Sequence, residues 1–422
     1  MEMQLLGGGE EVGGNAFLIQ NKSTNVMLDY GVKIQPEPPT YPIPPKRKID
    51  AIILSHSHLD HCGGIPALYG RNNRGNYPTF FTNQITLETT KLLIKDSMKI
   101  SKLENFPIPF NELDVKAMLS SAQTMSYRKR FDIGSFKGEF YDAGHIPGSA
   151  GTLLTDKDTG KRIFYTGDIG YKDTHLLKGC NLPDKVDTLI LESTYARKDH
   201  PSRKKEEERF LQELEESLAN NEKALVPVFA VGRSQEVLLI LEKYANKVAL
   251  DGMAKAASDI VLQHPEFIRD PERLQRILDK VLWVQNNDDR KKVLNKTPII
   301  VSTAGMLSGG PMIYYLKNLQ KNPKVHLLFS GFLVEDSPGR NLIKTSEYEN
   351  DEEKFHYSGR MSQYDFSGHA GRHELLKIIE KTNPSRIICV HGDDTKTFAK
   401  EINQRYKNIE AIAPKNGETV KL

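Results

Sequence analysis

The chain has 422 residues, of which 38% are hydrophobic and 27% are charged, and 58 basic against 55 acidic side chains give a formal net charge of +3. This composition is typical of a globular protein, and no apolar stretch approaches the roughly 18 residues that a membrane-spanning helix needs. The nearly balanced charge excludes binding of nucleic acid through net charge alone, although a local basic groove remains open. Chains longer than roughly 250 to 300 residues usually divide, so we expect two domains.

The three cysteines, Cys62, Cys180 and Cys389, are far apart and form no C-x-x-C pair. This spacing argues against a disulfide framework and against a zinc ribbon. The first residues, Met1-Glu2-Met3-Gln4-Leu5, lack the basic region and the long apolar core of a secretory signal. We therefore expect a soluble, cytoplasmic protein without a membrane partner.

The first thirty residues predict three short strands, at 3–6, 15–19 and 25–28, which are separated by turns. Glycines crowd the first of these turns, Gly7 to Gly14. No helix signal follows the glycines and no Gly-Lys-Ser/Thr is present, so tight turns explain them better than a phosphate-binding loop does. The proline-rich stretch Pro36 to Pro45 then predicts an irregular surface loop, to which we assign no role.

Three histidines and an aspartate gather in Ser55-His56-Ser57-His58-Leu59-Asp60-His61, directly after the apolar run 51–54. The apolar run predicts a buried strand, so the four donors would lie on the loop where that strand ends. Imidazole and carboxylate groups suit a divalent metal that activates water. His56 and His58, two positions apart on an irregular segment, can face one metal, while Asp60 and His61 turn toward a second.

Short helices and strands follow in alternation. Helices are predicted at 65–69, 85–100 and 112–119, and strands at 79–82, 136–141, 151–155, 162–166 and 188–191. His145 and Asp168 lie in glycine-flanked segments, each immediately beside a predicted strand. Because this placement matches that of His56, we expect both side chains at the same metal site.

From about Ser202 the pattern changes to helices and strands in alternation, beginning with a charged helix that ends near Leu218. This alternation continues to a strand at 325–329, is typical of βαβ units, and predicts a second domain. Histidines at loop positions reappear after residue 355. They are His369, in Ser367-Gly368-His369-Ala370, and His391, in Val390-His391-Gly392.

The ordered metal-binding residues of the first domain resemble those of the metallo-β-lactamase superfamily. They are Asp29, His56-Ser57-His58-Leu59-Asp60-His61, His145 and Asp168. The resemblance implies an α/β fold, namely an αββα sandwich with a dinuclear zinc site at one edge. It implies that one Zn²⁺ is held by His56, His58, His145 and Asp168, that the other is held by Asp60, His61 and the shared Asp168, and that Asp29 supports the ligands.

Motifs over nearly the whole remaining chain resemble the β-CASP ribonucleases of that superfamily. The match is to short archaeal proteins that are similar to the cleavage and polyadenylation specificity factor endonuclease but lack KH domains, and that are related to RNase J. The motifs are Leu191-Glu192-Ser193-Thr194-Tyr195, Phe229-Ala230-Val231-Gly232-Arg233-Ser234-Gln235-Glu236, Ser302-Thr303-Ala304-Gly305-Met306-Leu307-Ser308-Gly309-Gly310-Pro311, Ser367-Gly368-His369-Ala370 and Val390-His391-Gly392.

This second resemblance implies an α/β β-CASP domain at residues 196–354, inserted between metallo-β-lactamase parts at 1–195 and 355–422. It implies that His391 completes the second zinc site and that Glu192 and His369 form a hydrogen-bonded pair. Catalysis would then involve Asp60, Glu192 and His369.

The implied activity is zinc-dependent hydrolysis of RNA phosphodiester bonds by a dinuclear zinc-activated hydroxide, as a 5′-to-3′ exonuclease, an endonuclease or both. His369 would donate a proton to the leaving oxygen, and Glu192 would orient its imidazole. Products with 5′-phosphate and 3′-hydroxyl ends are expected. Single-stranded RNA would thread between the two domains, while a homodimer and RNA-processing or exosome-type partners are left open.

The glycine-rich segment after the predicted strand 299–302 precedes a helix near Pro311, so its backbone amides could hold a phosphate. Simple glycine-rich turns would explain the same pattern. We expect substrate contacts from Arg233, Ser302, Thr303, Gly305, Met306 and Arg340. For Arg340 an ion pair within the domain is the alternative to a contact with RNA.

Two other functions suit the same fold. One is a catalytically inactive scaffold of an RNA-processing complex, which is disfavoured because every ligand position is filled. The other is DNA hydrolysis. In DNA-directed β-CASP enzymes the residue at the position of His391 is typically replaced, so the histidine here favours RNA.

Overall fold

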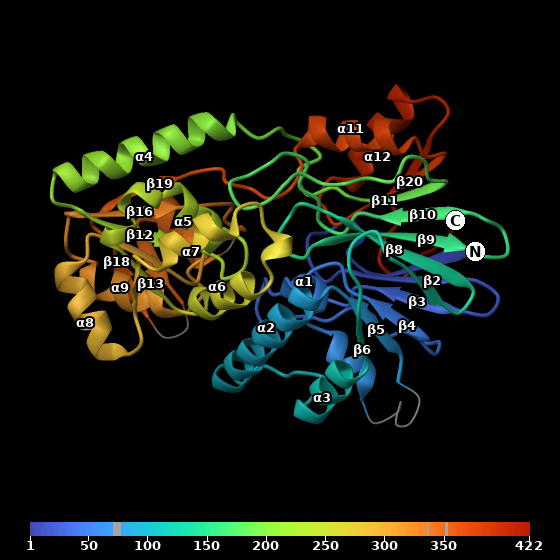
Figure 1. Cartoon of the computed structure of the whole chain (residues 1–422), viewed down its shortest axis with the longest axis horizontal. Coiled ribbons are helices and arrows are strands. Elements are labelled where there is room, and N and C mark those ends of the chain that lie inside the picture. Colours follow the sequence, from blue (N-terminus) through green and yellow to red (C-terminus); the bar gives the residue numbers. More distant parts are fainter. Residues whose placement is uncertain (71–76, 336, 351–352) are drawn as a thin grey trace. The chain divides into compact units, whose positions relative to one another are not determined.

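The computed structural model describes residues 1–70, 77–335, 337–350 and 353–422. The chain divides into two compact units (Figure 1). Unit 1 consists of Met1–Asp173, Gly179–Asp199 and Gly368–Leu422, and unit 2 consists of Thr174–Lys178 and His200–Ser367. Among the described residues no helix is long and apolar enough to cross a membrane.

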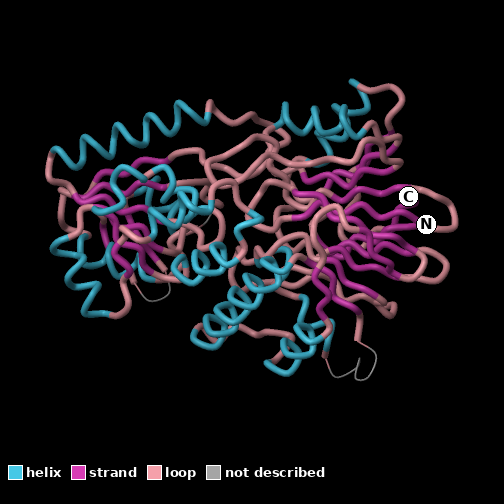
Figure 2. Tube along the Cα trace, viewed as in Figure 1, coloured by secondary structure: helices cyan, strands magenta, loops and turns pink. Residues whose placement is uncertain are grey.

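Unit 1 contains two seven-stranded sheets, which are magenta in Figure 2. The first has the order β22-β1-β2-β3-β4-β5-β6, antiparallel from β22 to β3 and parallel from β3 to β6. Its strands are β1 (Glu2–Gly7), β2 (Ala16–Gln20), β3 (Asn25–Leu28), β4 (Ala51–Ile53), β5 (Thr79–Thr82), β6 (Ala122–Thr124) and β22 (Thr419–Lys421).

The second sheet of unit 1 has the order β21-β20-β11-β10-β9-β8-β7, antiparallel from β7 to β10 and parallel from β10 to β21. Its strands are β7 (Arg130–Ile133), β8 (Phe136–Asp142), β9 (Ala150–Asp156), β10 (Arg162–Tyr165), β11 (Thr188–Glu192), β20 (Arg386–Val390) and β21 (Glu410–Ile412).

The two sheets of unit 1 face each other across a hydrophobic core. Leu5 and Ile19 of the first sheet belong to the same buried cluster as Tyr165 of the second. Alternate residues point away from this core, because successive side chains of a strand face opposite sides of the sheet. Leu18 therefore packs in the cluster on the outer face of the first sheet, and Phe164 in the cluster on the outer face of the second.

Helices cover both outer faces, so the layers of unit 1 are helix, sheet, sheet, helix. The 3-10 helix η1 (Ile65–Tyr69), α2 (Gln84–Leu103) and α3 (Glu112–Ser120) cover the first sheet, and α11 (Arg372–Thr382) and α12 (Thr395–Arg405) cover the second. A capping box begins α3: the side chain of Asn111 accepts from the backbone N–H of Asp114, whose carboxylate accepts from the N–H of Asn111.

The segment after β4 contains a single helical turn, α1 (Leu59–Cys62), which carries Asp60 and His61. The prediction of an irregular loop was therefore wrong for these two residues. The backbone N–H groups of His61 and Cys62 both donate to the carbonyl oxygen of His58, which closes the turn locally. Gly31 packs against the turn so closely that a Cβ there would lie 1.8 Å from the carbonyl oxygen of Asp60.

Unit 2 is built around a six-stranded sheet in which every pairing is parallel, with the order β14-β13-β15-β12-β16-β19. Its strands are β12 (Lys223–Pro227), β13 (Val248–Asp251), β14 (Leu282–Trp283), β15 (Ile299–Ser302), β16 (Val325–Phe329) and β19 (Arg360–Gln363), with a separate hairpin of β17 (Glu347–Glu349) and β18 (Lys354–His356). The alternation of helices and strands that the sequence predicts is thereby confirmed.

The helices of unit 2 include three that the sequence did not predict. They are α4 (Arg203–Ala219), α5 (Arg233–Ile240), η3 (Glu242–Lys247), α6 (Ala254–Gln263), η4 (Pro265–Phe267), α7 (Pro271–Leu278), α8 (Asn287–Lys296), α9 (Pro311–Leu319) and α10 (Pro338–Thr345). The unpredicted helices are α7, α10 and the 3-10 helix η4. All three begin at a proline, which is tolerated there because its missing N–H would have no partner in the first turn.

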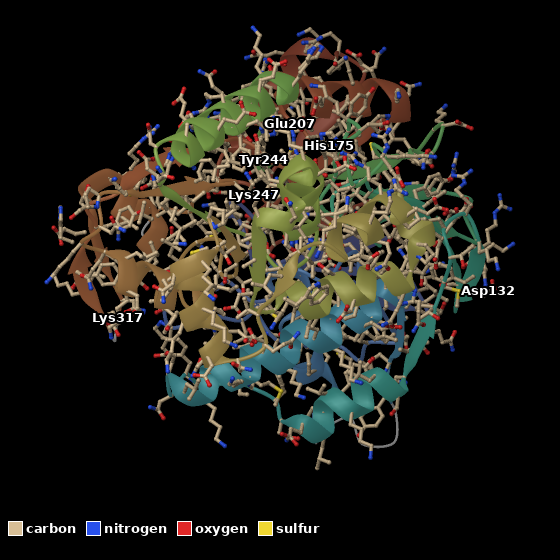
Figure 3. All side chains as sticks on the ribbon, turned by 60° about the vertical axis from the view of Figure 1, so that its left-hand side comes forward. Asp132, His175, Glu207, Tyr244, Lys247 and Lys317 are labelled. Carbon is tan, nitrogen blue, oxygen red and sulfur yellow. The ribbon has the colours of Figure 1, made fainter. Side chains whose placement is uncertain are left out.

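A short strap, Thr174–Lys178, belongs to unit 2 although the residues on both sides of it belong to unit 1. The backbone N–H groups of His175 and Leu176 donate to the carboxylate of Glu236, at 3.2 and 2.7 Å. Nε2 of His175 lies 3.0 Å from Oε2 of Glu207 on α4, and both residues are labelled in Figure 3. These contacts attach the strap to α4 and α5.

The domain ranges that the resemblance implies are 1–195, 196–354 and 355–422. The internal contacts of the chain group residues 355–367 with unit 2, where β19 pairs with β16. The three domain ranges therefore stay predictions from the resemblance.

Candidate metal centre

Four strands of the second sheet of unit 1 run in one direction and end at the same edge. They are β8, β10, β11 and β20: β10, β11 and β20 are parallel neighbours, and β8 is separated from β10 by the antiparallel β9. His145 follows β8, Asp168 follows β10, Glu192 is the last residue of β11 and His391 follows β20. Strand direction thus brings together polar side chains from distant parts of the chain.

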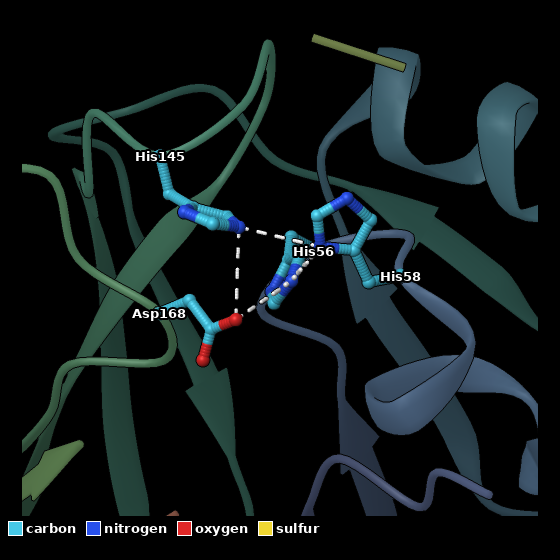
Figure 4. A group of neighbouring side chains, drawn as sticks. All are labelled: His56, His58, His145 and Asp168. Carbon is cyan, nitrogen blue, oxygen red and sulfur yellow. Dashed lines mark hydrogen bonds and ion pairs between the residues drawn. The ribbon is translucent and has the colours of Figure 1, made fainter. Parts of the chain in front are cut away.

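Four of the expected ligands form one group: His56, His58, His145 and Asp168 (Figure 4). Nδ1 of His58 lies 3.1 Å from Nε2 of His56 and 3.3 Å from Nε2 of His145. Oδ2 of Asp168 lies 3.4 Å from Nε2 of His56 and 3.6 Å from Nε2 of His145. Three imidazole nitrogens and one carboxylate oxygen therefore converge on one point.

A second group consists of Asp60, His61 and His391. Oδ2 of Asp60 lies 3.8 Å from Nε2 of both histidines. Oδ1 of Asp168 lies 3.2 Å from Nε2 of His61 and 3.5 Å from Nε2 of His391. The two oxygens of Asp168 thus face different groups, which is the arrangement of a carboxylate shared by two metal ions.

The residues fit a pair of divalent metal ions. The donors are imidazole nitrogens and carboxylate oxygens, the set that zinc takes in hydrolases. His56, His61 and Asp168 are almost completely buried. Oδ1 of Asp168 has no hydrogen-bond partner among the described residues, and a buried carboxylate oxygen without one is costly unless a cation satisfies it.

Asp29 lies outside the two groups and contacts His61, a member of the second group. Its Oδ2 lies 2.7 Å from Nδ1 of His61 and accepts from the hydroxyl groups of Ser55 and Tyr165, also at 2.7 Å. A carboxylate that accepts from Nδ1–H leaves Nε2 of the same imidazole free to bind a metal. Asp29 therefore orients His61, as the resemblance implies for a supporting residue.

Glu192 and His369 form a third group with Asp168. Nδ1 of His369 lies 2.9 Å from Oε1 of Glu192, which also accepts from the backbone N–H of Ile169 at 2.8 Å. Nε2 of His369 lies 3.9 Å from Oδ2 of Asp168. The imidazole thus has one nitrogen on Glu192 and the other at the metal-binding groups.

This environment shifts the pKa of both partners. Burial lowers the pKa of His369, but the nearby carboxylates of Glu192 and Asp168 outweigh it and raise the pKa to about 9. Burial raises the pKa of Glu192, but the attraction of His369 and its hydrogen bond outweigh it, so the pKa is lowered. His369 is thereby kept protonated and Glu192 ionised near neutral pH.

The expected substrate residues of unit 2 lie at the carboxyl edge of its sheet. Ser302 is the last residue of β15 and is fully buried. Gly305 packs against the segment after β12, since a Cβ there would lie 3.2 Å from the backbone nitrogen of Phe229. Arg233 begins α5, and its guanidinium lies near Gly331, just after β16.

Three further expected residues make contacts within unit 2. The hydroxyl of Thr303 accepts from the backbone N–H of Met253 at 3.3 Å, and the carbonyl oxygen of Met306 accepts from the N–H of Gly339 at 2.9 Å. Nε of Arg340 lies 3.2 Å from Oε1 of Glu335. This is the ion pair within the domain that the sequence left as one of two alternatives for Arg340.

The sequence analysis assigned no role to three residues that contact the expected ligands or their supporting residue Asp29: Asn15, Ser55 and Tyr165. Ser55 and Tyr165 donate to Asp29, and Asn15 lies beside His61 and His391. A hydroxyl-bearing residue next to apolar ones, such as Tyr165 after Ile163 and Phe164, is only a weak signal of a buried hydrogen bond. Only the pairing of strands shows which partner such a side chain meets.

The layers of unit 1 and the paired groups of histidine and aspartate at one edge define a metal-dependent hydrolase of the metallo-β-lactamase type. Family models match three parts of the chain. A beta-lactamase superfamily domain matches residues 24–239, a Beta-Casp domain matches residues 234–342, and a Zn-dependent metallo-hydrolase RNA specificity domain matches residues 357–414.

Similar proteins occur in archaea. The chain is 37% identical to "Probable RNase MJ4" of Methanocaldococcus jannaschii, with 100% of both chains covered. It is 33% identical to "RNase aCSPSF2" of Saccharolobus solfataricus, over 100% of this chain and 85% of that protein. It is 32% identical to "Transcription termination factor FttA" of Methanocaldococcus jannaschii, over 100% of this chain and 72% of that protein. The chain belongs to the β-CASP family of metallo-β-lactamase hydrolases.

A solved structure supports the fold alone. The crystal structure of a protein of unknown function from Enterococcus faecalis has a TM-score of 0.61 at 17% identity and covers 100% of this chain and 99% of that chain. The resemblance, the α/β fold class with its two kinds of domain, and the assignment as a metal-dependent hydrolase are thus confirmed.

Proposed function

We propose that this protein is a zinc-dependent ribonuclease that hydrolyses phosphodiester bonds of single-stranded RNA and leaves 5′-phosphate and 3′-hydroxyl ends. The observation that carries the proposal is the position of Asp168, whose two oxygens face two histidine groups while His369 lies beside one of them. RNA as the substrate is supported by the names of the relatives and by the RNA specificity domain matched at 357–414.

Two Zn²⁺ ions per chain suit the donor groups. One would be held by His56, His58, His145 and Asp168, and the other by Asp60, His61, His391 and the same Asp168. Bound there, such ions would lower the pKa of a water molecule and stabilise negative charge on the phosphoryl oxygens. Asp60 is the most exposed carboxylate of the three at the centre, so it lies nearest to an approaching substrate.

His369 is the proton donor in this proposal. Glu192 occupies its Nδ1, so the proton on Nε2 points toward Asp168 and the reacting phosphate. Departure of the 3′-oxygen of RNA requires a proton, because an alkoxide is a poor leaving group. Glu192 is buried and ionised, which fixes the imidazole in orientation and in protonation.

Contacts with the RNA backbone are assigned to the carboxyl edge of the sheet of unit 2. There β12 leads to β13 on one side of the sheet while β15 leads to β16 on the other, and ligands of α/β sheets bind where the strand order reverses in this way. Ser302 is the last residue of β15, Thr303, Gly305 and Met306 follow it, and Arg233 follows β12. Arg340 would leave its ion pair with Glu335 and bind a phosphate of the RNA instead.

Digestion of three matched substrates tests the proposal. The zinc-loaded chain is given a linear RNA with a 5′-monophosphate, a circular RNA of the same sequence and a DNA of that sequence, with the Asp60→Ala variant as the blank. We expect the RNA to be cut and the DNA spared. Cleavage of the circle identifies an endonuclease, and cleavage of the linear RNA alone identifies an exonuclease.

A zinc-loaded chain that cuts neither RNA would sink the proposal in favour of the scaffold. Equal cleavage of DNA would contradict the choice of substrate. Cleavage by the Asp60→Ala variant at the wild-type rate would show that this centre is not the source of the activity.

A further inference from the structure

The glycine-rich turn after β1, which the sequence explained only as tight turns, lies against His391. The backbone N–H of His391 donates to the carbonyl oxygen of Gly8 at 2.8 Å, and the backbone N–H of Gly13 is directed at Nδ1 of the imidazole, 3.3 Å away. Asn15 follows the turn and is completely buried. Its Nδ2 lies 2.7 Å from Nδ1 of His391 and 3.0 Å from Nε2 of His61.

Glycines are required for this approach. Gly8 has a φ of +76°, and a Cβ there would lie 2.4 Å from Oδ1 of Asn15. The backbone of Asn15 is fixed on both sides, since its N–H donates to the carbonyl oxygen of Asp60 and its carbonyl oxygen accepts from the N–H of Gly31, each at 2.9 Å. The turn therefore holds the Asn15 side chain in one place, beside two expected metal ligands.

The position of the proton on the imidazole of His391 determines whether the side chain of Asn15 must donate or accept a hydrogen bond. Nε2 of His391 faces the carboxylates of Asp168 and Asp60, at 3.5 and 3.8 Å, so Nε2 is the nitrogen that faces the metal-binding groups. A neutral imidazole that binds a metal through Nε2 carries its proton on Nδ1 and needs an acceptor there. Of the two groups beside Nδ1, the backbone N–H of Gly13 at 3.3 Å cannot accept a proton, and the amide of Asn15 at 2.7 Å can accept one only through its oxygen.

A half-turn of the side-chain amide of Asn15, which exchanges Oδ1 and Nδ2, supplies this acceptor. Its Oδ1 is buried and has no hydrogen-bond partner within the described part of the chain. The two ends of a carboxamide have nearly the same shape, and their assignment follows from the hydrogen-bond network. Exchanging them places Oδ1 against Nδ1–H of His391 at 2.7 Å and gives up the longer hydrogen bond of Nδ2 to the carbonyl oxygen of Asp60 at 3.4 Å.

We propose that the side-chain oxygen of Asn15 accepts the Nδ1–H of His391 and so holds Nε2 of this histidine toward the second metal ion. Asn15 is thus a positioning residue, and the glycine-rich turn is part of the metal centre. The inference rests on the proposed metal-binding role of His391. It adds the acceptor that this ligand requires, as Asp29 provides one for His61.

Zinc content of four full-length proteins tests the inference. The wild type and the variants Asn15→Ala, Asn15→Asp and Asn416→Ala are equilibrated with chelator-buffered zinc, and bound zinc is measured by mass spectrometry. Asn416 is the matched control, because its exposed side chain accepts from the N–H of Gly9 in the same turn and is not a partner of His391. Loss of such a partner weakens metal binding about 10- to 100-fold.

We expect two zinc ions in the wild type, in Asn15→Asp and in Asn416→Ala, and one in Asn15→Ala at intermediate free zinc. The carboxylate of Asn15→Asp can accept but cannot donate, so retention of both ions there identifies the acceptor role. Loss of the second ion in Asn15→Asp as well as in Asn15→Ala would overturn the inference, and so would retention of both ions in Asn15→Ala.

A second readout does not depend on the folding of any variant at Asn15. The ring-nitrogen NMR signals of histidines labelled with ¹⁵N in the wild type, with His391→Gln for assignment, show which nitrogen of His391 carries the proton. A proton on Nδ1 supports the inference, and a proton on Nε2 overturns it. A wild type that binds no zinc would sink the proposed function and this inference together, whereas a zinc-loaded wild type with the proton on Nε2 would overturn the role of Asn15 alone.

Discussion

Each of three histidines at the centre uses one nitrogen for the reaction centre and the other for a partner that orients it. Nδ1 of His61 lies on Asp29, and Nδ1 of His369 lies on Glu192. For His391 the partner is Asn15, an amide in place of a carboxylate. At His369 the carboxylate of Glu192 favours a charged imidazole, which suits a proton donor. At His61 and His391 the partner at Nδ1 leaves Nε2 available for a metal ion.

Replacement of His369 separates proton donation from metal binding. The variant His369→Ala should lower the cleavage rate of RNA by roughly 10²- to 10⁴-fold, the usual contribution of a general acid, and keep its zinc. A phosphodiester with a nitrophenolate leaving group needs no proton, so its hydrolysis should fall much less. Rates on both substrates, with zinc content, check this; an equal loss on both would contradict proton donation by His369.

Removal of one hydrogen bond to Asp29 should destabilise unit 1. Tyr165→Phe deletes the hydroxyl that donates to Oδ2 of Asp29 at 2.7 Å and keeps the packing of the ring. A hydrogen bond to a charged group contributes about 1.5 to 3 kcal/mol, so the free energy of unfolding should fall by about that much. Urea denaturation measures it. Tyr141→Phe is the control, and an equal loss there would argue against a special role for Asp29.

At the scale of elements, strand direction and short turns position the side chains of the expected metal centre. β8, β10, β11 and β20 end at one edge, while α1 presents Asp60 and His61 from the first sheet. The strap Thr174–Lys178 is a different kind of element, because it has no regular structure and is held by side chains of α4 and α5. Its attachment therefore depends on ionisation.

Attachment of the strap should weaken at alkaline pH. The hydrogen bond to Glu207 raises the pKa of His175 above its ordinary value of 6.5, with a further contribution from Glu236, and burial and the charge of Arg273 oppose this rise by less. A raised pKa means that the stabilisation is complete below about 6.5 and is lost as the pH rises through the raised value. Glu207 has a lowered pKa, since His175 and Arg203 outweigh its burial, so its contribution is lost only in acid.

Hydrogen exchange of the backbone amides of His175 and Leu176 as a function of pH measures this attachment. Exchange is corrected for its intrinsic pH dependence and compared with the variant His175→Gln, which keeps the backbone bonds to Glu236. We expect the protection of the wild type to decrease on the alkaline side and that of the variant to stay level. The same decrease in both proteins would exclude His175 as its cause.

At the scale of the whole molecule, every expected metal ligand belongs to unit 1, although the ligands extend along the chain from His56 to His391. Metal ions that join such distant segments stabilise the folded state by linkage, because the unfolded chain cannot assemble the donors. Unit 2 contributes none of these groups.

Removal of zinc should therefore destabilise unit 1 selectively. At a free zinc concentration about 1,000 times the dissociation constant, one bound ion stabilises the folded state by about 4 kcal/mol. Chelation should lower the unfolding temperature and increase hydrogen exchange in β10 and β20, with little change in β12 and β15. Equal increases in both units would contradict the assignment of all ligands to unit 1.

The sequence predicted most of the centre because its signals are local. Four donors within six residues, and histidine or aspartate beside a predicted strand at His145 and Asp168, need no knowledge of the tertiary structure. The same holds for the alternation of helices and strands after Ser202. The pairing of Glu192 with His369 came from the resemblance alone, because no spacing along the chain relates residues that lie so far apart.

Other features were decided only by the tertiary structure, because they depend on contacts between segments that are distant in sequence. The register of β10, β11 and β20 determines that the two oxygens of Asp168 face different groups. The left-handed turn at Gly8 determines that Asn15 meets His391. The residue types of a metal centre are thus written in the sequence, whereas the partners that orient them are set where strands and turns from separate parts of the chain meet.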